Sequence, residues 1–260
     1  MRTRDRILRV GLGALGAVAA LCLWQLAATV GPLANSLLPS ASATLLDTAR
    51  LLATAEMWQA TADTLAIALL GLAGSLLGGV LVGIGIGASP LAMHATRAPL
   101  EFLKPIPPIV ILPITVLLLG PTAEMGVFLI FFGGFVSIAV QTSAGVFDTD
   151  PVARATGLSY GMGRAEILSR IVLPSALPYI GTAFRIAAPA ALVVAVVAGL
   201  LGGGPGLGKM LLLSQMAGNR PQLLGYVLIL GVLGVLIQIL SEAAERSLLH
   251  WHPQYRKESH

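Results

Sequence analysis

The sequence predicts an all-α, polytopic membrane protein with six transmembrane helices. Apolar residues make up 56% of the 260 residues and charged residues only 11%, whereas about a quarter of the residues in a soluble domain are charged. The mean hydropathy is +0.86. Apolar runs that reach the roughly 20 residues needed to cross a bilayer lie near residues 8–30, 62–88, 100–119, 124–146, 175–200 and 222–243.

The lysines and arginines predict the orientation of the chain in the membrane. The net charge of +4 and the isoelectric point near 9.6 would suggest a nucleic-acid partner in a soluble chain, but here most of the cations lie in short loops, where they set topology. With the N-terminus inside, the cytoplasmic cations are Arg2, Arg4, Arg6, Arg9, Arg97, Arg154, Arg164, Arg170, Arg246, Arg256 and Lys257. The outer cations are only Arg50, Lys209 and Arg220. Both termini and the loop at 147–172 are therefore expected in the cytoplasm, and no nucleic-acid partner is expected.

Residues 1–31 are expected to form an N-terminal transmembrane helix. The alternative is a signal peptide cleaved near residues 40–43, but the apolar run of the first span is longer than the 7–15 residues typical of a signal sequence. A retained helix is therefore favoured. Residues 32–61 are expected to form an extracytoplasmic connecting segment, because residues 40–60 are weakly amphipathic and suit the outer membrane surface.

The second and third predicted spans carry unusual residues. Glycines recur four residues apart in the second span, at Gly74/Gly78, Gly79/Gly83 and Gly83/Gly87. Such small-residue faces allow helices to approach closely, either within one bundle or at a dimer interface. The third span opens with prolines that interrupt regular helix geometry, namely Pro105, Pro107, Pro108 and Pro113. Irregular backbone in a bilayer requires cover by protein or a water-filled cavity, so we expect the start of this span near the translocation pathway; a simple kinked helix is the alternative.

A polar loop of about 25 residues, Asp150 to Pro174, separates the fourth and fifth spans. Two short amphipathic pieces flank Gly161 and Gly163, and the loop runs into Leu173 and Pro174, where the next apolar helix begins. A turn between two spans does not need this length. The loop is therefore expected to be a docking surface for a cytoplasmic partner.

Patterns typical of enzymes and of secondary carriers do not fit this sequence. Residues 203–209 match a phosphate-binding loop except that Met210 stands where the motif has Ser or Thr, and the segment follows an apolar helix rather than a strand. We expect a tight turn there. Histidines do not pair with cysteines or carboxylates at metal-ligand spacing, and intramembrane carboxylates, which proton-coupled carriers need, are scarce. We expect a non-catalytic chain without a metal site.

Arg185 is the exception among the predicted spans. It lies 11 residues after Pro174, inside the fifth span, where a guanidinium is costly and is by default a functional hypothesis. Arg185 can present a forked donor to a small anion in the translocation pathway. The alternative is a structural residue that bonds to carbonyls or reaches toward the interface.

The chain resembles the permease subunits of bacterial ABC importers of the nitrate/sulfonate/taurine group. The resemblance covers residues 50–250 and is carried by the stretches 104–120, 150–180 and 204–211. It implies the type I ABC importer permease fold, with a permease core at 62–250, a cytoplasmic coupling loop at 147–172 and a cytoplasmic tail at 251–260. It also implies the cytoplasmic membrane of a bacterium, where the chain forms the pathway for an organic sulfonate, taurine, nitrate or similar small anion.

In this family the loop carries the EAA motif, whose short helix enters a cleft of the ATPase. Counting back from Leu173 and Pro174 places the glycine of the motif at Gly161 and its Glu-Ala-Ala at Ala155, Thr156 and Gly157. The glutamate is thus missing, and Arg154, Arg164 or Glu166 are candidates for substitute contacts. The residues that the resemblance assigns to ATPase coupling are Arg154, Ala155, Thr156, Gly157, Ser159, Gly161 and Arg164.

The resemblance also implies the partners: a second copy of the chain, two ATP-binding subunits that hold ATP and magnesium, and an extracytoplasmic solute-binding protein. No cofactor is expected on this chain. Candidates for the translocation pathway are Pro105, Pro107, Pro108 and Arg185. A secondary carrier, or a regulatory membrane protein whose loop binds a soluble partner, is the alternative function.

Overall fold

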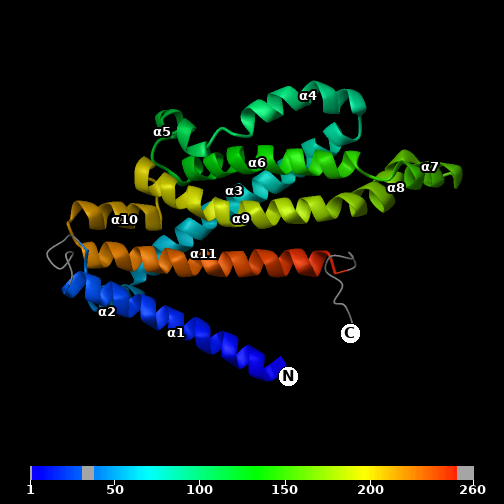
Figure 1. Cartoon of the computed structure of the whole chain (residues 1–260). Coiled ribbons are helices and arrows are strands. Elements are labelled where there is room, and N and C mark those ends of the chain that lie inside the picture. The colour runs from blue at the N-terminus through cyan, green and yellow to red at the C-terminus, as the bar shows by residue number, and fades with distance from the viewer. Residues whose placement is uncertain (1, 31–37, 251–260) are drawn as a thin grey trace. The chain divides into compact units, whose positions relative to one another are not determined.

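The computed structural model describes residues 2–30 and 38–250 (Figure 1), so the tail expected at 251–260 lies outside the described residues. The described secondary structure is helical, as predicted. The chain divides into two compact units: Met1–Trp58 with Met210–Gly231, and Gln59–Lys209 with Val232–His260. The predicted coupling loop and the residues assigned to the pathway all belong to the second, larger unit.

The helices of the larger unit follow the predicted spans with shifted boundaries. They are α3 (Ala55–Gly87, which begins in the smaller unit), α4 (Pro90–Leu103), α5 (Leu112–Leu119), α6 (Ala123–Phe147), α7 (Pro151–Ser159), α8 (Arg164–Ile167), α9 (Leu173–Gly202), the start of α10 (Leu207–Met216) and the end of α11 (Arg220–Leu248). Within the described residues, five helical segments are long and apolar enough to cross a membrane, and a bent pair of helices brings the number to six. The predicted number of six spans holds if this pair counts as one span.

The predicted third span, 100–119, is wrong as a continuous helix. The chain instead forms α4, a non-helical turn, a short 3₁₀ helix (Pro108–Ile111) and α5, with a bend of 75° between Pro90–Leu103 and Pro108–Leu119. The cause is the three prolines Pro105, Pro107 and Pro108, which lack the backbone donors that a regular helix needs. Pro107 itself is extended, with φ −65° and ψ 135°. The irregular geometry expected here is confirmed, and the simple kink is excluded.

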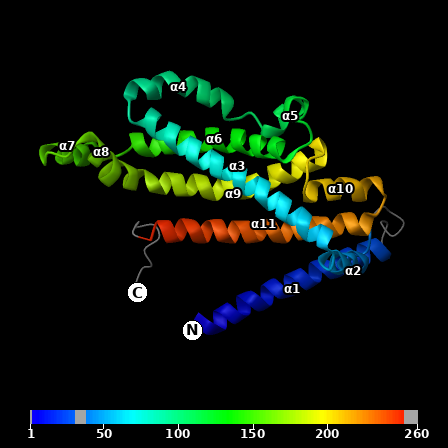
Figure 2. The same ribbon diagram turned by 180° about the vertical axis from the view of Figure 1, so that it is seen from behind.

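A row of glycines on α3 lets this helix lie almost directly on α6 (Figure 2). A Cβ added to Gly79 would lie 2.9 Å from the Cβ of Ile138, and one added to Gly83 would lie 2.6 Å from the Cβ of Thr142. Gly87 meets Val146 in the same way at 2.7 Å. Contacts this short exclude any side chain larger than hydrogen. These glycines therefore serve packing within one bundle, which was one of the two interpretations of their spacing; the other was a dimer interface.

Helix α9 continues from the coupling loop into the membrane without a break. A π-helical segment, Leu168–Val172, joins α8 to α9, so that one helical stretch runs from Arg164 to Gly202. A π turn changes the hydrogen-bonding register just before Pro174, whose ring nitrogen cannot donate to a carbonyl one turn earlier. The second half of the loop and α9 therefore form one continuous helical stretch.

The predicted tight turn at residues 203–209 is confirmed and joins α9 to α10. Gly203 and Gly206 have φ values of 76° and 112°, which disfavour residues other than glycine. The turn is fixed to α3, because the Thr64 hydroxyl accepts a hydrogen bond of 2.8 Å from the Leu207 N–H. The turn connects two helices, whereas a phosphate-binding loop follows a strand.

The smaller unit contains α1 (Arg2–Thr29) and α2 (Ala41–Leu52). Ser40 caps α2 by accepting a hydrogen bond from the Ala43 N–H at 3.3 Å. Trp24 at the end of α1 donates to the Pro39 carbonyl at 3.1 Å. A helix thus occupies part of the segment predicted to be an extracytoplasmic connection.

Candidate functional site

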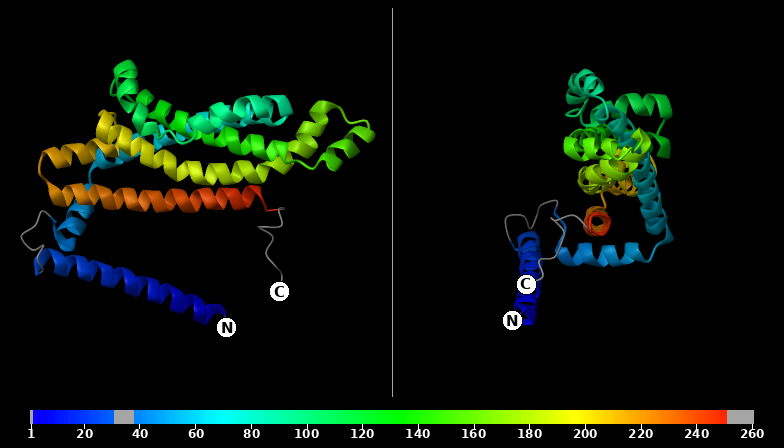
Figure 3. Two further views of the ribbon diagram at one scale, coloured as in Figure 1. Left: turned by 45° about the horizontal axis from the view of Figure 1, so that its top comes forward. Right: turned by 90° about the vertical axis from the view of Figure 1, so that its right-hand side faces the viewer.

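The coupling loop is a helical hairpin, α7 followed by α8. Figure 3 shows the hairpin extending past the ends of α6 and α9. Asp150 caps α7 by accepting a hydrogen bond from the Val152 N–H at 2.8 Å, and Pro151 occupies the first turn, where its missing N–H costs nothing. The start of the short helix is therefore fixed by its own sequence.

Gly161, where the resemblance places the glycine of the motif, ends α7 in a left-handed conformation. Its φ is 79°, and two hydrogen bonds close the helix end, from Gly161 N–H to Leu158 O at 2.9 Å and from Met162 N–H to Gly157 O at 3.0 Å. This pair of bonds is the Schellman motif, which requires a left-handed residue at the Gly161 position. The turn between α7 and α8 depends on this glycine.

The hairpin is anchored on its inner side by residues that the sequence assigned to ATPase coupling. Gly157 is buried, and a Cβ there would lie 2.9 Å from Ile171 Cδ1. Arg154 is half-buried and its guanidinium donates to the Val146 carbonyl at the end of α6. Both residues face the helical bundle of the chain, and so they position the hairpin.

The outer side of the hairpin is exposed and includes large apolar side chains. The predicted coupling residues on this side are Ala155, Thr156, Ser159, Gly161 and Arg164. Beside them, Leu158 is 61% exposed and Tyr160 is 84% exposed. Large apolar side chains exposed outside the membrane region are typical of a surface that binds another protein.

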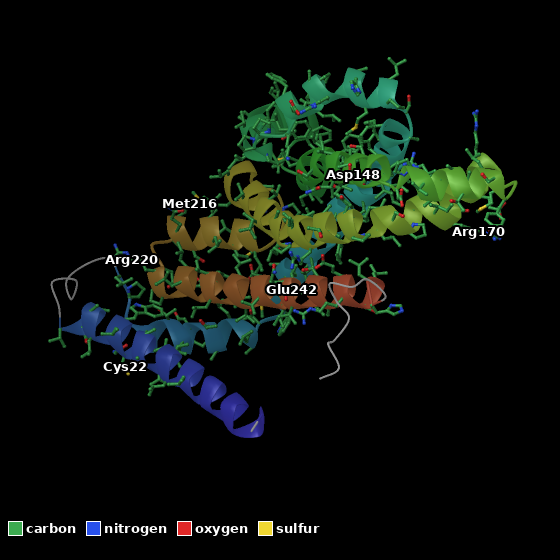
Figure 4. All side chains as sticks on the ribbon, turned by 45° about the vertical axis from the view of Figure 1, so that its right-hand side comes forward. Cys22, Asp148, Arg170, Met216, Arg220 and Glu242 are labelled. Atoms are coloured by element: carbon green, nitrogen blue, oxygen red, sulfur yellow. The ribbon has the colours of Figure 1, made fainter. Side chains whose placement is uncertain are left out.

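The junction of the hairpin with the bundle is braced by a second polar contact. The Tyr179 hydroxyl on α9 donates to Asp148 Oδ2 at the end of α6, at 3.0 Å. Figure 4 labels Asp148 there and Arg170 in the π-helical segment that follows the hairpin. Arg170 pairs with Glu166 at 3.2 Å, so Glu166, proposed as a substitute for the missing motif glutamate, already has a partner within its own helical stretch.

A pocket of about 390 Å³ lies behind the proline segment, between α3, α6 and α9. Pro105, Pro107 and Pro108, which the sequence analysis assigned to the translocation pathway, form part of the wall of this pocket. Pro108 lies directly against Gly133 of α6, where a Cβ would clash with the proline ring. The other wall residues are mainly apolar, and the polar ones are Ser75, Lys104, Ser137 and Gln141.

Arg185 does not line this pocket, although its neighbours Ile186 and Ala187 do. Its Nε lies 3.2 Å from Glu245 Oε2 on α11. The other carboxylate oxygen of Glu245 accepts a hydrogen bond from the Thr182 hydroxyl at 3.2 Å. The side chain of Glu245 is 1% exposed and that of Arg185 is 41% exposed. This ion pair favours the structural interpretation of Arg185.

The sequence interpretation missed two residues of this region. These are Glu245 and Lys104, to which the sequence analysis assigned no role. The available signal for Lys104 was its position directly before the proline run, at the end of α4, where it is exposed. For Glu245 no local pattern reveals which face of α11 is buried.

The described residues form a helical bundle with several segments that are long and apolar enough to span a membrane, a pocket behind a broken segment and an exposed hairpin. The model of one protein family, described as "Binding-protein-dependent transport system inner membrane component", matches residues 75–250. The chain belongs to this family. It is therefore a multi-pass permease subunit of the inner membrane, and not an enzyme, as the sequence predicted.

The comparisons also identify individual relatives. The chain is 31% identical to the taurine transport system permease protein TauC of Escherichia coli K12 over 201 residues, which cover 76% of this chain and 72% of TauC. It is 26% identical to the putative aliphatic sulfonates transport permease protein SsuC of the same organism over 241 residues, 92% of this chain and 90% of SsuC. The fold is similar to a chain of a bacterial ABC transporter involved in the import of alginate, with a TM-score of 0.64 and 14% identity over 95% of this chain and 99% of that one.

Proposed function

We propose that two copies of this chain form the transmembrane pathway of an ATP-driven importer for a small anion, such as an organic sulfonate, taurine or nitrate. The observation that carries the proposal is the α7–α8 hairpin, which is firmly anchored on one side and exposes Leu158 and Tyr160 on the other. The names of the relatives, which transport taurine and aliphatic sulfonates, support the substrate class.

In this proposal each hairpin enters a cleft of a separate ATP-binding subunit, and the two ATPases bind ATP and magnesium. An extracytoplasmic solute-binding protein delivers the anion. Residues 1–31 and 32–61 form the first span and an outer connection, residues 62–250 form the permease core, and residues 251–260 form a cytoplasmic tail. The excess of inner lysines and arginines supports cytoplasmic termini.

The coupling residues divide between two roles in this proposal. Ala155, Thr156, Ser159, Gly161 and Arg164 lie on the exposed side and contact the ATPase. Arg154 and Gly157 hold the hairpin against α6 and the π-helical segment. Because α8, the π-helical segment and α9 form one continuous helical stretch, displacement of the hairpin by the ATPase moves α9, which forms one wall of the pocket.

The experiment that tests the docking role is Gly161→Val in the permease co-expressed with its ATPase. A β-branched residue at φ 79° carries a strain of about 1–2 kcal/mol, and the turn distorts to relieve it. We expect the variant to insert into the membrane while co-purification of the ATPase and ATP-driven uptake into proteoliposomes fall about tenfold or more, since 1.4 kcal/mol corresponds to a factor of about ten.

Gly163→Val is the matched control. Gly163 has φ −71°, which any residue adopts, and a Cβ there meets nothing within 4 Å. This variant should retain the ATPase. Wild-type uptake by Gly161→Val, or robust ATP hydrolysis by the purified permease alone, contradicts the proposal.

A further inference from the structure

The pocket behind the proline segment contains one positive charge and no negative charge. Lys104 is the only ionisable residue that lines it in the described part of the chain. No carboxylate lies within 4 Å of its amine among the residues that the structure places. Lys104 thus differs from Arg185, whose charge Glu245 already compensates.

Two further polar side chains of the pocket have open hydrogen-bonding groups. Ser137 and Gln141 are one helical turn apart on α6 and therefore share a face. Within the described ranges, neither side chain has a hydrogen-bond partner. Ser75, by contrast, donates to the Gly71 carbonyl at 2.8 Å, so its hydroxyl is already used. The Ser137 hydroxyl, the Gln141 amide and the Lys104 amine are three groups that can donate hydrogen bonds to an acceptor in the pocket.

The rest of the pocket wall is apolar. It is formed by the prolines and by side chains such as Leu72, Ile130 and Val194. Its volume of about 390 Å³ is near the small end of the roughly 300–1,000 Å³ of small-molecule sites. Such a wall favours an apolar part of a ligand by removing it from water and offers nothing to a second charged group.

Resting on the proposed function, we propose that this pocket is a binding site inside the permease for a monoanion that carries an apolar tail and no ammonium group. The anionic head lies against Lys104, Ser137 and Gln141, and the tail lies against the proline segment and α9. An aliphatic sulfonate has this chemistry. A zwitterion such as taurine brings an ammonium for which no carboxylate lines the pocket, and nitrate has no tail to bury.

The site explains why the third span is broken. The turn at 104–107 places Lys104 at the edge of the pocket together with three of the prolines, and Pro108 approaches α6 closely because Gly133 has no side chain. A continuous helix through 100–119 would spread these residues around its circumference. The break therefore brings the charge and the apolar wall to one place.

The test is calorimetric titration of 1-butanesulfonate into the intact permease–ATPase complex in nanodiscs at fixed ionic strength. We expect the wild-type complex to bind this probe, with taurine and nitrate at least about tenfold weaker. Lys104→Gln should weaken binding about ten- to a hundredfold, because a charge-assisted hydrogen bond is lost. Gln141→Leu should weaken it less.

Lys209→Gln is the matched control, because Lys209 is an exposed lysine of the same unit that does not line the pocket. Its binding should equal that of the wild type. Absence of binding by the wild type, unchanged binding by Lys104→Gln, or equally tight binding of taurine overturns the inference. The ATPase content of the same preparation separates the two proposals: a complex that retains its ATPase and binds no probe refutes only this site, whereas a permease that binds no ATPase refutes the proposed function.

Discussion

Arg185 and Lys104 are both cations in the membrane part of the larger unit, and their surroundings are opposite. Arg185 lies 3.2 Å from a carboxylate that is 1% exposed and is bonded on its other oxygen by Thr182. Lys104 stands at the end of α4, at the edge of an apolar pocket that contains no carboxylate among the residues lining it. Arg185 lies deep in a predicted span, yet of these two cations it is Lys104 that has no ion-pair partner among the residues that the structure describes.

This difference shows that a charged residue in a membrane span can be assigned a function only after it is known whether another side chain pairs with it. A buried ion pair is costly to break because the remaining charge is left without compensation. An unpaired cation at a pocket is available to a ligand. Removing the charge of Arg185 should therefore lower stability, whereas removing the charge of Lys104 should weaken ligand binding.

The largest expected effect on stability is that of Arg185→Met. The variant leaves the Glu245 carboxylate buried without its cation, and we expect the free energy of unfolding to fall by about 2–4 kcal/mol, somewhat less than the ~3–5 kcal/mol of a fully buried pair because the arginine is partly exposed. Chemical denaturation of the permease in mixed micelles measures this.

The control is the double variant Arg185→Met with Glu245→Leu. Replacing both charges by apolar groups is often close to neutral, so most of the lost stability should return. If the double variant is as unstable as the single one, the two charges do not stabilise each other, and Arg185 is again a candidate for the translocation pathway.

Gly133→Ala is expected to have a smaller effect on stability and to act on the pocket. A Cβ at this position would clash with the ring of Pro108, and overpacking of this kind costs about 1–3 kcal/mol. The proline segment must move, and Lys104 moves with it, so binding of 1-butanesulfonate should fall. The Arg185–Glu245 pair is outside this contact and should remain intact.

Gly85→Ala is the matched control for Gly133→Ala. A Cβ at Gly85 meets nothing within 4 Å, and alanine is a better helix former than glycine by up to about 1 kcal/mol. This variant should be as stable as the wild type or slightly more stable. Equal stabilities of the two alanine variants would show that Pro108 is not seated tightly on α6.

The smallest expected change in stability is that of Lys104→Gln. The lysine has no ion pair among the described residues, so its replacement should change the free energy of unfolding by less than about 0.5 kcal/mol. The same denaturation measurement checks this. A loss comparable to that of Arg185→Met would assign Lys104 a structural role and remove the contrast between the two cations.

The sequence predicted irregular backbone in the third span but not the angle between its two halves. Three prolines within four residues exclude a regular helix, and the sequence indicated irregular backbone there. It did not reveal that α4 begins at Pro90 or that the two halves meet at 75°. The angle between the halves depends on how Pro108 packs against Gly133, two residues far apart in the chain. The start of α4 follows instead from Ser89, which caps the helix by accepting a hydrogen bond from the Ala92 N–H.

The hairpin was predicted more completely than the pocket. Asp150 and Gly161 form hydrogen bonds with their own neighbours, and Pro151 occupies the first turn, where its missing N–H costs nothing. A local pattern is therefore sufficient to identify the start and the end of α7. The inward position of Gly157 was not predictable, because it depends on the packing of α7 against Ile171 in the segment before α9.

The sequence by itself determined that this chain is helical, lies in a membrane and carries a long polar loop between two spans, because hydrophobic run length, charge placement and turn chemistry are local properties. Only the tertiary structure decided which of the two cations is compensated. An ion pair depends on which faces of two distant helices meet, as α9 and α11 do at Arg185 and Glu245, and neither helix encodes that contact in its own pattern. The pocket follows the same rule, since α3, α6, α9 and the proline segment form its wall only once they are packed together.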